Sequence, residues 1–413
     1  MRGKVTLYIF ILIYILVDIY VFQALKSAID VTSSWKYLIW GAYWSVALAS
    51  WVGLYFLPRM YEYGQHQNII LVFLILGLFL GKLLVVVFLL IDDLRRGGIK
   101  LYSLFQKKPE ETKSVVHGFT RSQFLSRAGL IVGGSFFGLL AYGISNRYNY
   151  KIRKVKIKFP HLPKTFDGLK VVQLSDIHSG SFDNHEKVQK GIDMVLAEKP
   201  DLILFTGDLV NSKSIEMEDY LKQFSQLKAP MGVYATLGNH DYGDYAEWPS
   251  KEAKAANLQL LKDMESGMGW QMLNNEHVVL EKEGERIGLI GVENWSAKPR
   301  FPKYGDMSKA MEGLPELPFN LLMSHDPSHW DAQVRPDYPN IDLMLAGHTH
   351  GMQFGVEIPW LKWSPIQYLY KEWAGLYKKG KQYLYVNRGY GFLGYPGRVG
   401  ILPEITVMEL KRG

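Results

Sequence analysis

Short polar blocks rich in Asp, His and Asn follow apolar stretches in the second half of the chain. The blocks are Asp176-Ile177-His178, Gly207-Asp208, Gly238-Asn239-His240-Asp241, Ser324-His325-Asp326 and Gly347-His348-Thr349-His350-Gly351. Carboxylate, imidazole and amide groups together suit Mn, Fe or Zn, whereas Ca prefers oxygen ligands alone. The chain has no Cys, which excludes thiolate zinc and iron–sulfur sites. The blocks therefore predict a divalent metal centre built from five loops.

Each block comes directly after an apolar run of strand length. The runs are 169–174, 202–206, 233–237, 320–323 and 341–346. Runs of this length, closed by Gly or a polar residue, suit central strands covered on both faces. Because open α/β folds place ligand sites at the C-terminal ends of strands, we expect the five blocks to converge.

This donor set suits chemistry on phosphate esters, which are anionic and repel a nucleophile. Two metals about 3.5–4 Å apart clamp the phosphoryl oxygens and hold a bridging water as hydroxide. Such a pair needs a carboxylate that touches both ions, with imidazole and amide donors completing each shell. We therefore expect two divalent metal ions, Mn, Fe or Zn, and a phosphoester substrate.

In order and identity, the blocks resemble the pattern of the calcineurin-like metallophosphoesterase superfamily, which is D-x-H, G-D, G-N-H-[DE], H and G-H-x-H. The likeness covers about the last 255 residues. Within this superfamily, the tail residues 397–399 and 403–410 resemble the final strand of membrane-associated bacterial phosphodiesterases of the kind called YkuE or YaeI. One departure is Met352, where that group usually has a second Gly.

The resemblance implies a role for each site residue. The implied ligands of one metal are Asp176, His178 and His350. Those of the other are Asn239, His325 and His348. Asp208 is similar to the carboxylate that bridges the two ions, and His240 to a histidine that steadies the phosphoryl group and can protonate the leaving oxygen. Asp241 would orient the His240 ring, with an ordinary turn or helix cap as the alternative.

The rest of the catalytic half alternates strands and helices. The stretch 151–159 is spaced as a strand, and 186–199, 218–227 and 251–265 are spaced as helices. This pattern predicts two mixed sheets packed face to face with helices outside. The resemblance implies the same four-layer α-β-β-α sandwich, and we assign it to residues 151–413.

The first 150 residues are expected to form a bundle of three to four transmembrane helices. The predicted spans are about 5–25, 37–57, 69–91 and 127–144, the last being the shortest. Three long apolar runs in succession argue against a cleaved signal peptide. We predict an integral protein of the cell (inner) membrane in contact with membrane lipids.

Charge is divided unevenly along the chain. Residues 1–158 carry 20 Lys/Arg and 7 Asp/Glu, whereas residues 159–413 carry 27 and 33. The catalytic half therefore lacks the basic excess of a nuclease, which argues against a nucleic-acid partner. The basic loop at 92–126 is expected in the cytoplasm. With four spans, the catalytic domain is then expected outside the cytoplasm.

Two further features lie outside the metal blocks. Asp18 and Lys82 fall inside predicted spans, where an ion pair holding the bundle together is favoured over an ion or substrate path. The stretch 358–377 is rich in Trp and Tyr. It is expected either to pack in the core or to form a lid or lipid-facing surface.

These observations favour a membrane-anchored, dinuclear metallophosphoesterase, a hydrolase with phosphodiesterase or pyrophosphatase activity. The resembling group includes enzymes of lipid A synthesis that cleave UDP-2,3-diacylglucosamine, so a lipid- or nucleotide-linked phosphoester is a candidate substrate. An extracytoplasmic domain would count against a UDP-sugar. The alternative is a non-catalytic membrane receptor or transporter accessory that binds a phosphorylated ligand. A soluble cyclic-nucleotide phosphodiesterase is disfavoured by the apolar spans.

Overall fold

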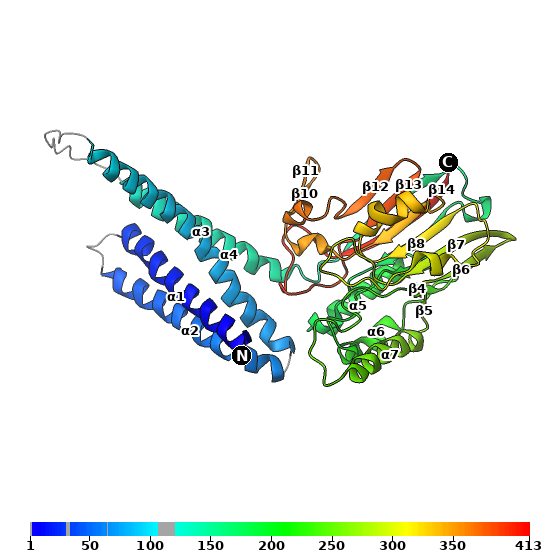
Figure 1. Ribbon diagram of the computed structural model, residues 1–413, viewed down its shortest axis with the longest axis horizontal. Coiled ribbons are helices and arrows are strands. Elements are labelled where there is room, and N and C mark those ends of the chain that lie inside the picture. Colours follow the sequence, from blue (N-terminus) through cyan, green and yellow to red (C-terminus); the bar gives the residue numbers. More distant parts are fainter. Residues whose placement is uncertain (1, 30–33, 64, 106–119) are drawn as a thin grey trace. The chain divides into compact units, whose positions relative to one another are not determined.

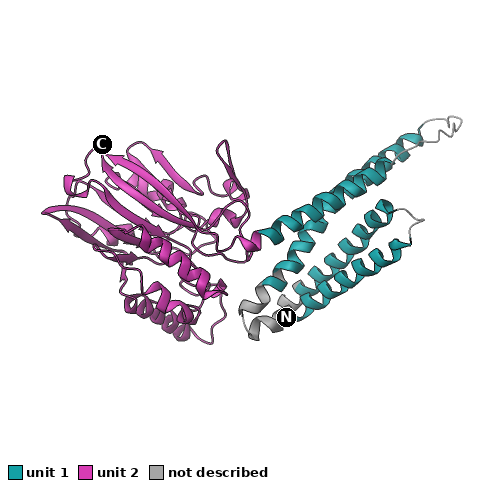
Figure 2. Cartoon of the chain, turned by 180° about the vertical axis from the view of Figure 1, so that it is seen from behind, with its two compact units in different colours: residues 1–142 teal, residues 143–413 magenta. Residues whose placement is uncertain are grey.

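A computed structural model describes residues 2–29, 34–63, 65–105 and 120–413 (Figure 1). The chain divides into two compact units, residues 1–142 and 143–413 (Figure 2). The first is helical, and the second contains all the strands of the described chain. Each unit is described separately below.

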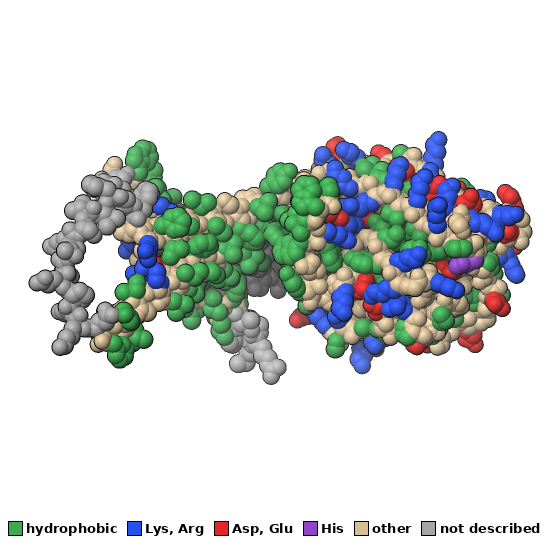
Figure 3. Space-filling model, turned by 90° about the horizontal axis from the view of Figure 1, so that it is seen from above, with side chains coloured by type: hydrophobic (Ala, Val, Ile, Leu, Met, Phe, Trp, Pro, Cys, Tyr) green, Lys and Arg blue, Asp and Glu red, His purple; other side chains and the backbone are tan. Residues whose placement is uncertain are grey.

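Four long helices make up the first unit, and the fourth continues three residues into the second. They are α1 (Arg2–Ala28), α2 (Trp35–Tyr63), α3 (Gln65–Ser103) and α4 (Arg121–Ser145). All four are long and apolar enough to cross a membrane, and hydrophobic side chains cover much of the surface of this unit (Figure 3). The fourth helix is longer than the predicted span 127–144. The basic loop is shorter than expected because α3 continues to Ser103, and residues 106–119 of that loop lie outside the described residues.

The expected ion pair between α1 and α3 is confirmed. The Lys82 Nζ lies 2.6 Å from Asp18 Oδ1. The same carboxylate accepts hydrogen bonds from the Tyr43 hydroxyl and from Trp51 Nε1, both at 2.9 Å. A buried charge needs such partners in an apolar surrounding. Three helices are therefore joined through one carboxylate, which fits the structural interpretation.

The second unit contains two six-stranded mixed sheets. In spatial order, the first has β1 (Lys151–Phe159), β14 (Glu404–Arg412), β2 (Leu169–Leu174), β3 (Leu202–Phe205), β4 (Val233–Ala235) and β5 (Gln271–Met272). The second has β12 (Gly375–Lys379), β13 (Gln382–Val386), β9 (Leu343–Ala346), β8 (Asn320–Ser324), β7 (Glu285–Val292) and β6 (Glu276–Lys282). A separate hairpin pairs β10 (Val356–Ile358) with β11 (Leu361–Trp363).

Alternation along the strands sends side chains into two different cores. In β2, Val171 packs into the core between the two sheets, and Val172 packs into the core beneath the outer helices. In β8, Leu321 and Leu322 divide in the same way between the inter-sheet core and the opposite outer face. Both faces of these strands are therefore covered, which explains their nearly continuous apolar sequences.

Helices complete the outer layers. The first sheet is covered by α5 (His185–Ala197), α6 (Leu221–Phe224) and α7 (Lys251–Gly267), and short helices α8 (Met307–Met311) and α9 (Arg335–Asp337) accompany the second. Asn184 and Ser250 cap α5 and α7 by accepting from backbone N–H groups. The predicted α/β fold of two mixed sheets with outer helices is confirmed (Figure 1). The helix predicted at 218–227 is confirmed in part: α6 lies within it, and a 3-10 helix at Ser214–Tyr220 precedes α6.

Candidate metal centre

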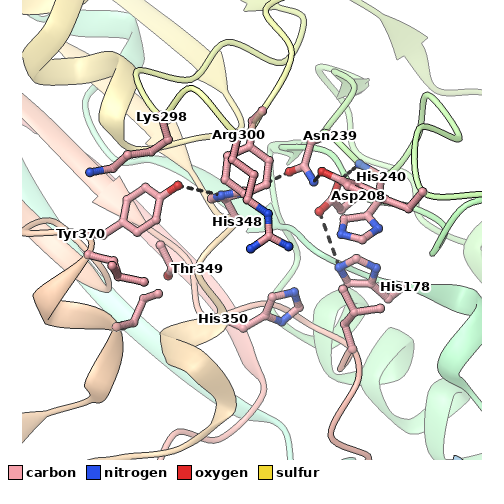
Figure 4. Close-up of a pocket in the computed structure, with 15 residues that line it drawn as sticks. His178, Asp208, Asn239, His240, Lys298, Arg300, His348, Thr349, His350 and Tyr370 are labelled. Atoms are coloured by element: carbon pink, nitrogen blue, oxygen red, sulfur yellow. Dashed lines mark hydrogen bonds and ion pairs between the residues drawn. The ribbon is translucent and has the colours of Figure 1, made fainter. Parts of the chain in front are cut away.

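The five polar blocks lie in the loops that follow β2, β3, β4, β8 and β9. Two of these loops come from the second sheet and three from the first. Parallel pairing within each sheet brings the strand ends to one edge. The expected convergence is therefore present: side chains of four blocks line one cavity (Figure 4), and His325 of the remaining block lies beside Asp208.

One cluster consists of Asp176, His178 and His350. Their potential ligand atoms all lie within 4.8 Å of one another. His350 Nε2 is 3.2 Å from Asp176 Oδ1, and all three side chains are buried. This is the set of donors that the sequence assigns to one metal.

A second cluster consists of Asp208, His325 and His348, again within 4.8 Å. His325 Nε2 is 3.1 Å from Asp208 Oδ2, and His178 Nε2 of the first cluster is 3.5 Å from the same oxygen. One carboxylate oxygen thus lies beside donors of both clusters. That is the position required of a bridging ligand.

Asn239 and His240 lie between these clusters. Asn239 Oδ1 is 2.8 Å from His348 Nδ1, so its amide oxygen faces the second cluster. The backbone N–H of His240 donates to Asp208 Oδ1 at 2.8 Å. Its ring Nδ1 is held 2.7 Å from the carbonyl of Asn211, which leaves Nε2 for the cavity that His240 lines.

Asp241 has a different role from the expected one. Its carboxylate accepts four backbone N–H groups, from Asp208 and Gly238 at Oδ2 and from Leu209 and Val210 at Oδ1, at 2.8–3.3 Å. The ring of His240 is oriented by Asn211 instead. The expectation that Asp241 orients His240 is therefore wrong: Asp241 shapes the backbone of the loop that carries Asp208.

The imidazole nitrogens test whether the clusters fit metal ions. Among the described residues, both ring nitrogens of His178 and the Nε2 atoms of His325 and His350 are buried and make no well-aligned hydrogen bond, although the three Nε2 atoms lie 3.1–3.5 Å from carboxylate oxygens of Asp208 or Asp176. His325 Nδ1 is 2.7 Å from the Thr206 carbonyl, an arrangement that directs its other nitrogen towards Asp208. Buried polar atoms normally make hydrogen bonds, so several imidazole nitrogens without a well-aligned hydrogen bond in one place are typical of metal ligands. The donor set fits two divalent cations.

Electrostatics also favour the metal-binding forms of these groups. Burial lowers the pKa of His178 to about 3 and that of His348 to about 4, so both rings are neutral near pH 7. Burial opposes protonation of His325 too, but the Asp208 carboxylate raises its pKa to about 10. A cation beside Asp208 would take the place of that proton, since metals bind deprotonated ligands.

Backbone conformation distinguishes the proposed ligands from their surroundings. Five of them have left-handed φ angles between 49° and 69°: Asp176, His178, Asp208, His348 and His350. Non-glycine residues rarely adopt this region, and such strain gathers at functional sites. Met352 also has a positive φ, 55°, a conformation that Gly adopts with less strain.

The cavity has a volume of about 560 Å³ and is lined by both cationic and apolar side chains. Lys298 and Arg300 line the cavity, with Lys298 beside Tyr370 (Figure 4). Ile366, Leu369 and Leu393 contribute apolar surface. The sequence interpretation missed Lys298, Arg300 and Leu393, which no short motif marks, whereas Ile366 and Leu369 lie in the stretch 358–377 for which a lid or lipid-facing surface was one expectation.

Tyr370 and Arg398 hold two of the histidines and were also missed as site residues. The Tyr370 hydroxyl is 2.9 Å from His348 Nε2 and donates to Asp326 at 3.1 Å. The buried Arg398 guanidinium lies 3.2 Å from His350 Nδ1 and donates to the Arg388 carbonyl at 2.7 Å. Together with burial, this cation holds the pKa of His350 well below its usual range.

Known protein families match the sequences of both units. Residues 169–352 match the calcineurin-like phosphoesterase family, and residues 1–147 match a family described as the probable transmembrane domain of calcineurin-like phosphoesterases. The metallophosphoesterase YkuE of Bacillus subtilis is 30% identical over 306 residues, which cover 71% of this chain and 98% of YkuE.

Two other relatives extend this comparison. A transmembrane protein with a metallophosphoesterase domain from Danio rerio is 32% identical over 66% of this chain, but the match spans only 60% of that protein. The UDP-2,3-diacylglucosamine pyrophosphatase LpxG of Chlamydia muridarum is 28% identical over 61% of this chain and 85% of LpxG. With its two clusters of metal donors at the expected strand ends, the chain belongs to the calcineurin-like phosphoesterase family.

Proposed function

We propose that the protein is a membrane-anchored, dinuclear metal-dependent phosphohydrolase acting on phosphodiester or pyrophosphate bonds. The observation that carries the proposal is the pair of buried donor clusters, in which one Asp208 carboxylate oxygen lies beside imidazole nitrogens of both. The family membership and the apolar helices support the same assignment.

The proposed reaction adds water to phosphorus and breaks the bond from phosphorus to the leaving oxygen. Two bound cations would neutralise the phosphoryl oxygens and lower the pKa of the attacking water. The Arg300 guanidinium and Lys298 ammonium would bind further anionic oxygens of the substrate. His240 Nε2, when protonated, would give its proton to the leaving oxygen, because Asn211 holds the opposite ring nitrogen.

The substrate we propose is a lipid-linked phosphoester. The cavity combines cationic and apolar walls, which suits a charged group joined to a hydrocarbon part. LpxG, at 28% identity, suggests UDP-2,3-diacylglucosamine as one example. A second phosphoryl group would explain the two cationic side chains, as a pyrophosphate carries more charge than a monoanionic diester.

Orientation in the membrane bears on this choice. We propose that the catalytic domain lies outside the cytoplasm, because Arg95, Arg96 and Lys100 at the end of α3 favour a cytoplasmic position for that end. UDP-sugars are cytoplasmic, so this orientation favours a lipid phosphoester without a nucleotide. Labelling of single cysteines in intact cells with a membrane-impermeant thiol reagent would test it, since the chain has no natural Cys.

The decisive experiment measures hydrolysis of bis-p-nitrophenyl phosphate by the full chain in nanodiscs with added manganese. We expect turnover in the wild type and a loss of at least about a hundredfold in Asp208→Asn, because that carboxylate serves both clusters. Bound metal, measured by mass spectrometry, should fall in the same variant. A wild type without activity for every divalent cation tested would refute the proposal.

A further inference from the structure

The β10–β11 hairpin and the turn that follows it expose large apolar side chains. Trp360 at the hairpin tip is 83% exposed, and Tyr368 and Leu369 are 76% and 63% exposed. The same surface also includes Met352, Val356, Ile358 and Leu361. We call these seven residues the aromatic hairpin surface. The hairpin pairs with neither six-stranded sheet, so this exposure is not a gap in sheet packing.

Packing accounts for only part of the aromatic stretch noted in the sequence. Trp373 and Tyr370 are 4% and 7% exposed and belong to a small buried core with Ile366. Trp360 and Tyr368 lie on the same stretch but point outward. Contiguous exposed apolar surface usually marks an interaction site, and Trp and Tyr are favoured at the membrane–water interface.

Hydrogen bonds tie this hairpin to the end of a membrane helix. The Arg398 N–H donates to the carbonyl of Gly143, in the last turn of α4, at 2.9 Å. The next residue, Val399, donates to Gln353 at 2.8 Å and accepts from Gly355 at 2.9 Å, and these two residues immediately precede β10. One short segment thus joins the end of α4 to the base of the hairpin.

The length of α4 places that junction near the bilayer surface. Its 25 residues would span about 37 Å, more than the roughly 30 Å of hydrocarbon in a bilayer. The ends of α4 therefore lie at headgroup depth. A hairpin attached to that end is within reach of the interface, so a bilayer is the occupant that the structure favours for the aromatic hairpin surface.

The metal cavity opens onto the same surface. Leu369, which is largely exposed, also lines the cavity, as does the neighbouring Ile366. The cationic side chains Lys298 and Arg300 line the cavity as well. An apolar path thus leads from the exposed turn towards the metal clusters.

We propose that the aromatic hairpin surface inserts into the headgroup region of the bilayer and admits lipid-linked phosphoesters to the metal centre. The hydrocarbon part of the substrate lies against Ile366 and Leu369, and the phosphoryl group faces Arg300 and the metal ligands. The membrane contact stands on its own, whereas the substrate route rests on the proposed phosphohydrolase function.

Depth-dependent fluorescence quenching tests the membrane contact. Because the chain has no Cys, Trp360→Cys provides a single labelling site for an NBD probe on the full chain in phospholipid nanodiscs. Leu260→Cys on α7, 44% exposed, is the matched control. Lipids with a nitroxide near the headgroup should quench the probe at position 360 and not at 260. If neither the probe at position 360 nor the probe at position 260 is quenched, the proposal is overturned. This outcome includes a hairpin that is covered by a protein partner.

A pair of substrates with one leaving group tests the route. Hexadecyl p-nitrophenyl phosphate in phosphatidylcholine vesicles reports entry from the bilayer, and bis-p-nitrophenyl phosphate reports the chemistry. In the double variant Trp360→Ser/Leu361→Ser, we expect hydrolysis of the long-chain diester to fall about tenfold, because interfacial burial of two large side chains is lost. Hydrolysis of the soluble diester should be unchanged, since neither residue lines the cavity.

The outcomes separate this inference from the function on which it rests. Ile215→Ser/Leu260→Ser removes exposed apolar side chains away from the hairpin and should leave both rates unchanged. Equal losses on the two substrates in the hairpin variant would indicate packing and overturn the route. A wild type inactive on both substrates would refute the phosphohydrolase function, while the quenching result would still decide the membrane contact.

Discussion

Replacing Asp241 by Asn tests whether the loop carrying Asp208 is held by a buried carboxylate. The substitution keeps the shape of the side chain and removes its charge. Each carboxylate oxygen of Asp241 accepts two backbone N–H groups, at 2.8 Å and 2.8 Å for Oδ2 and at 2.8 Å and 3.3 Å for Oδ1. In either orientation, an amide NH₂ group would face two N–H donors.

The expected cost follows from these contacts. Asn retains one acceptor and loses two hydrogen bonds, each contributing about 1.5–3 kcal/mol above pH 7, because burial and Asp208 raise the pKa of Asp241 to about 7 and the bonds are charge-assisted only when it is ionised. The 3.3 Å bond lies on the Oδ1 side, so the amide group should settle there at the lower end of this range, about 3 kcal/mol. For a domain of this size, such a loss lowers the unfolding midpoint by roughly 6–12 °C.

Thermal unfolding of the full chain in nanodiscs, with chelator present, measures this loss without a contribution from bound metal. Asp306→Asn is the matched control, because Asp306 accepts one backbone N–H at the start of α8 and Asn caps equally well. We expect the control to unfold with the wild type, and Asp241→Asn to unfold earlier and bind less manganese. Equal midpoints for all three proteins would refute the assigned role of Asp241.

Three further outcomes are expected. Asp18→Asn and Lys82→Met should each lower the unfolding midpoint, and the double variant should lose less than their sum; additive losses would contradict a structural ion pair. Burial lowers the pKa of His329 to about 4, so unfolding free energy should fall by about 3 kcal/mol from pH 6.5 to 4, and His329→Gln should remove that loss. Manganese should raise the midpoint of the wild type but not of Asp208→Asn, as measured by calorimetry.

Apolar patterning predicted much of the fold because it reports burial directly. The boundaries of β1 and β2 agree with the predicted 151–159 and 169–174, where alternation or a closed apolar run is unambiguous. The start of the helix predicted at 218–227 was placed too late, because the helical structure begins as a 3-10 helix at Ser214. The Glu216 side chain accepts hydrogen bonds from the backbone N–H groups of Asn211, Ser212 and Lys213. These side-chain bonds shape a tighter turn there.

Site residues could be predicted only where their type and their order in the sequence indicate metal binding. Asp176, Asp208 and the clustered histidines are recognisable from their blocks. The partner of His240 was not, because a backbone carbonyl such as that of Asn211 leaves no trace in sequence. Lys298, Arg300 and Arg398 reach the cavity or its ligands from loops without a motif, so only the tertiary structure brings them together.

The backbone conformation of the proposed metal-binding residues lowers the local stability of the site. Left-handed φ angles at five proposed ligands cost about 1 kcal/mol or more each, and buried nitrogens without a well-aligned hydrogen bond add to that cost. Surrounding hydrogen bonds compensate, such as those from the His348 N–H to the Asp176 carboxylate at 3.0 Å and from the Asp208 N–H to Asp241. A selection for stability alone would favour Gly or Asn at these positions. Their presence as Asp and His is explained by the requirement to aim donors at a common centre, which is the physical basis for assigning that centre to metal ions.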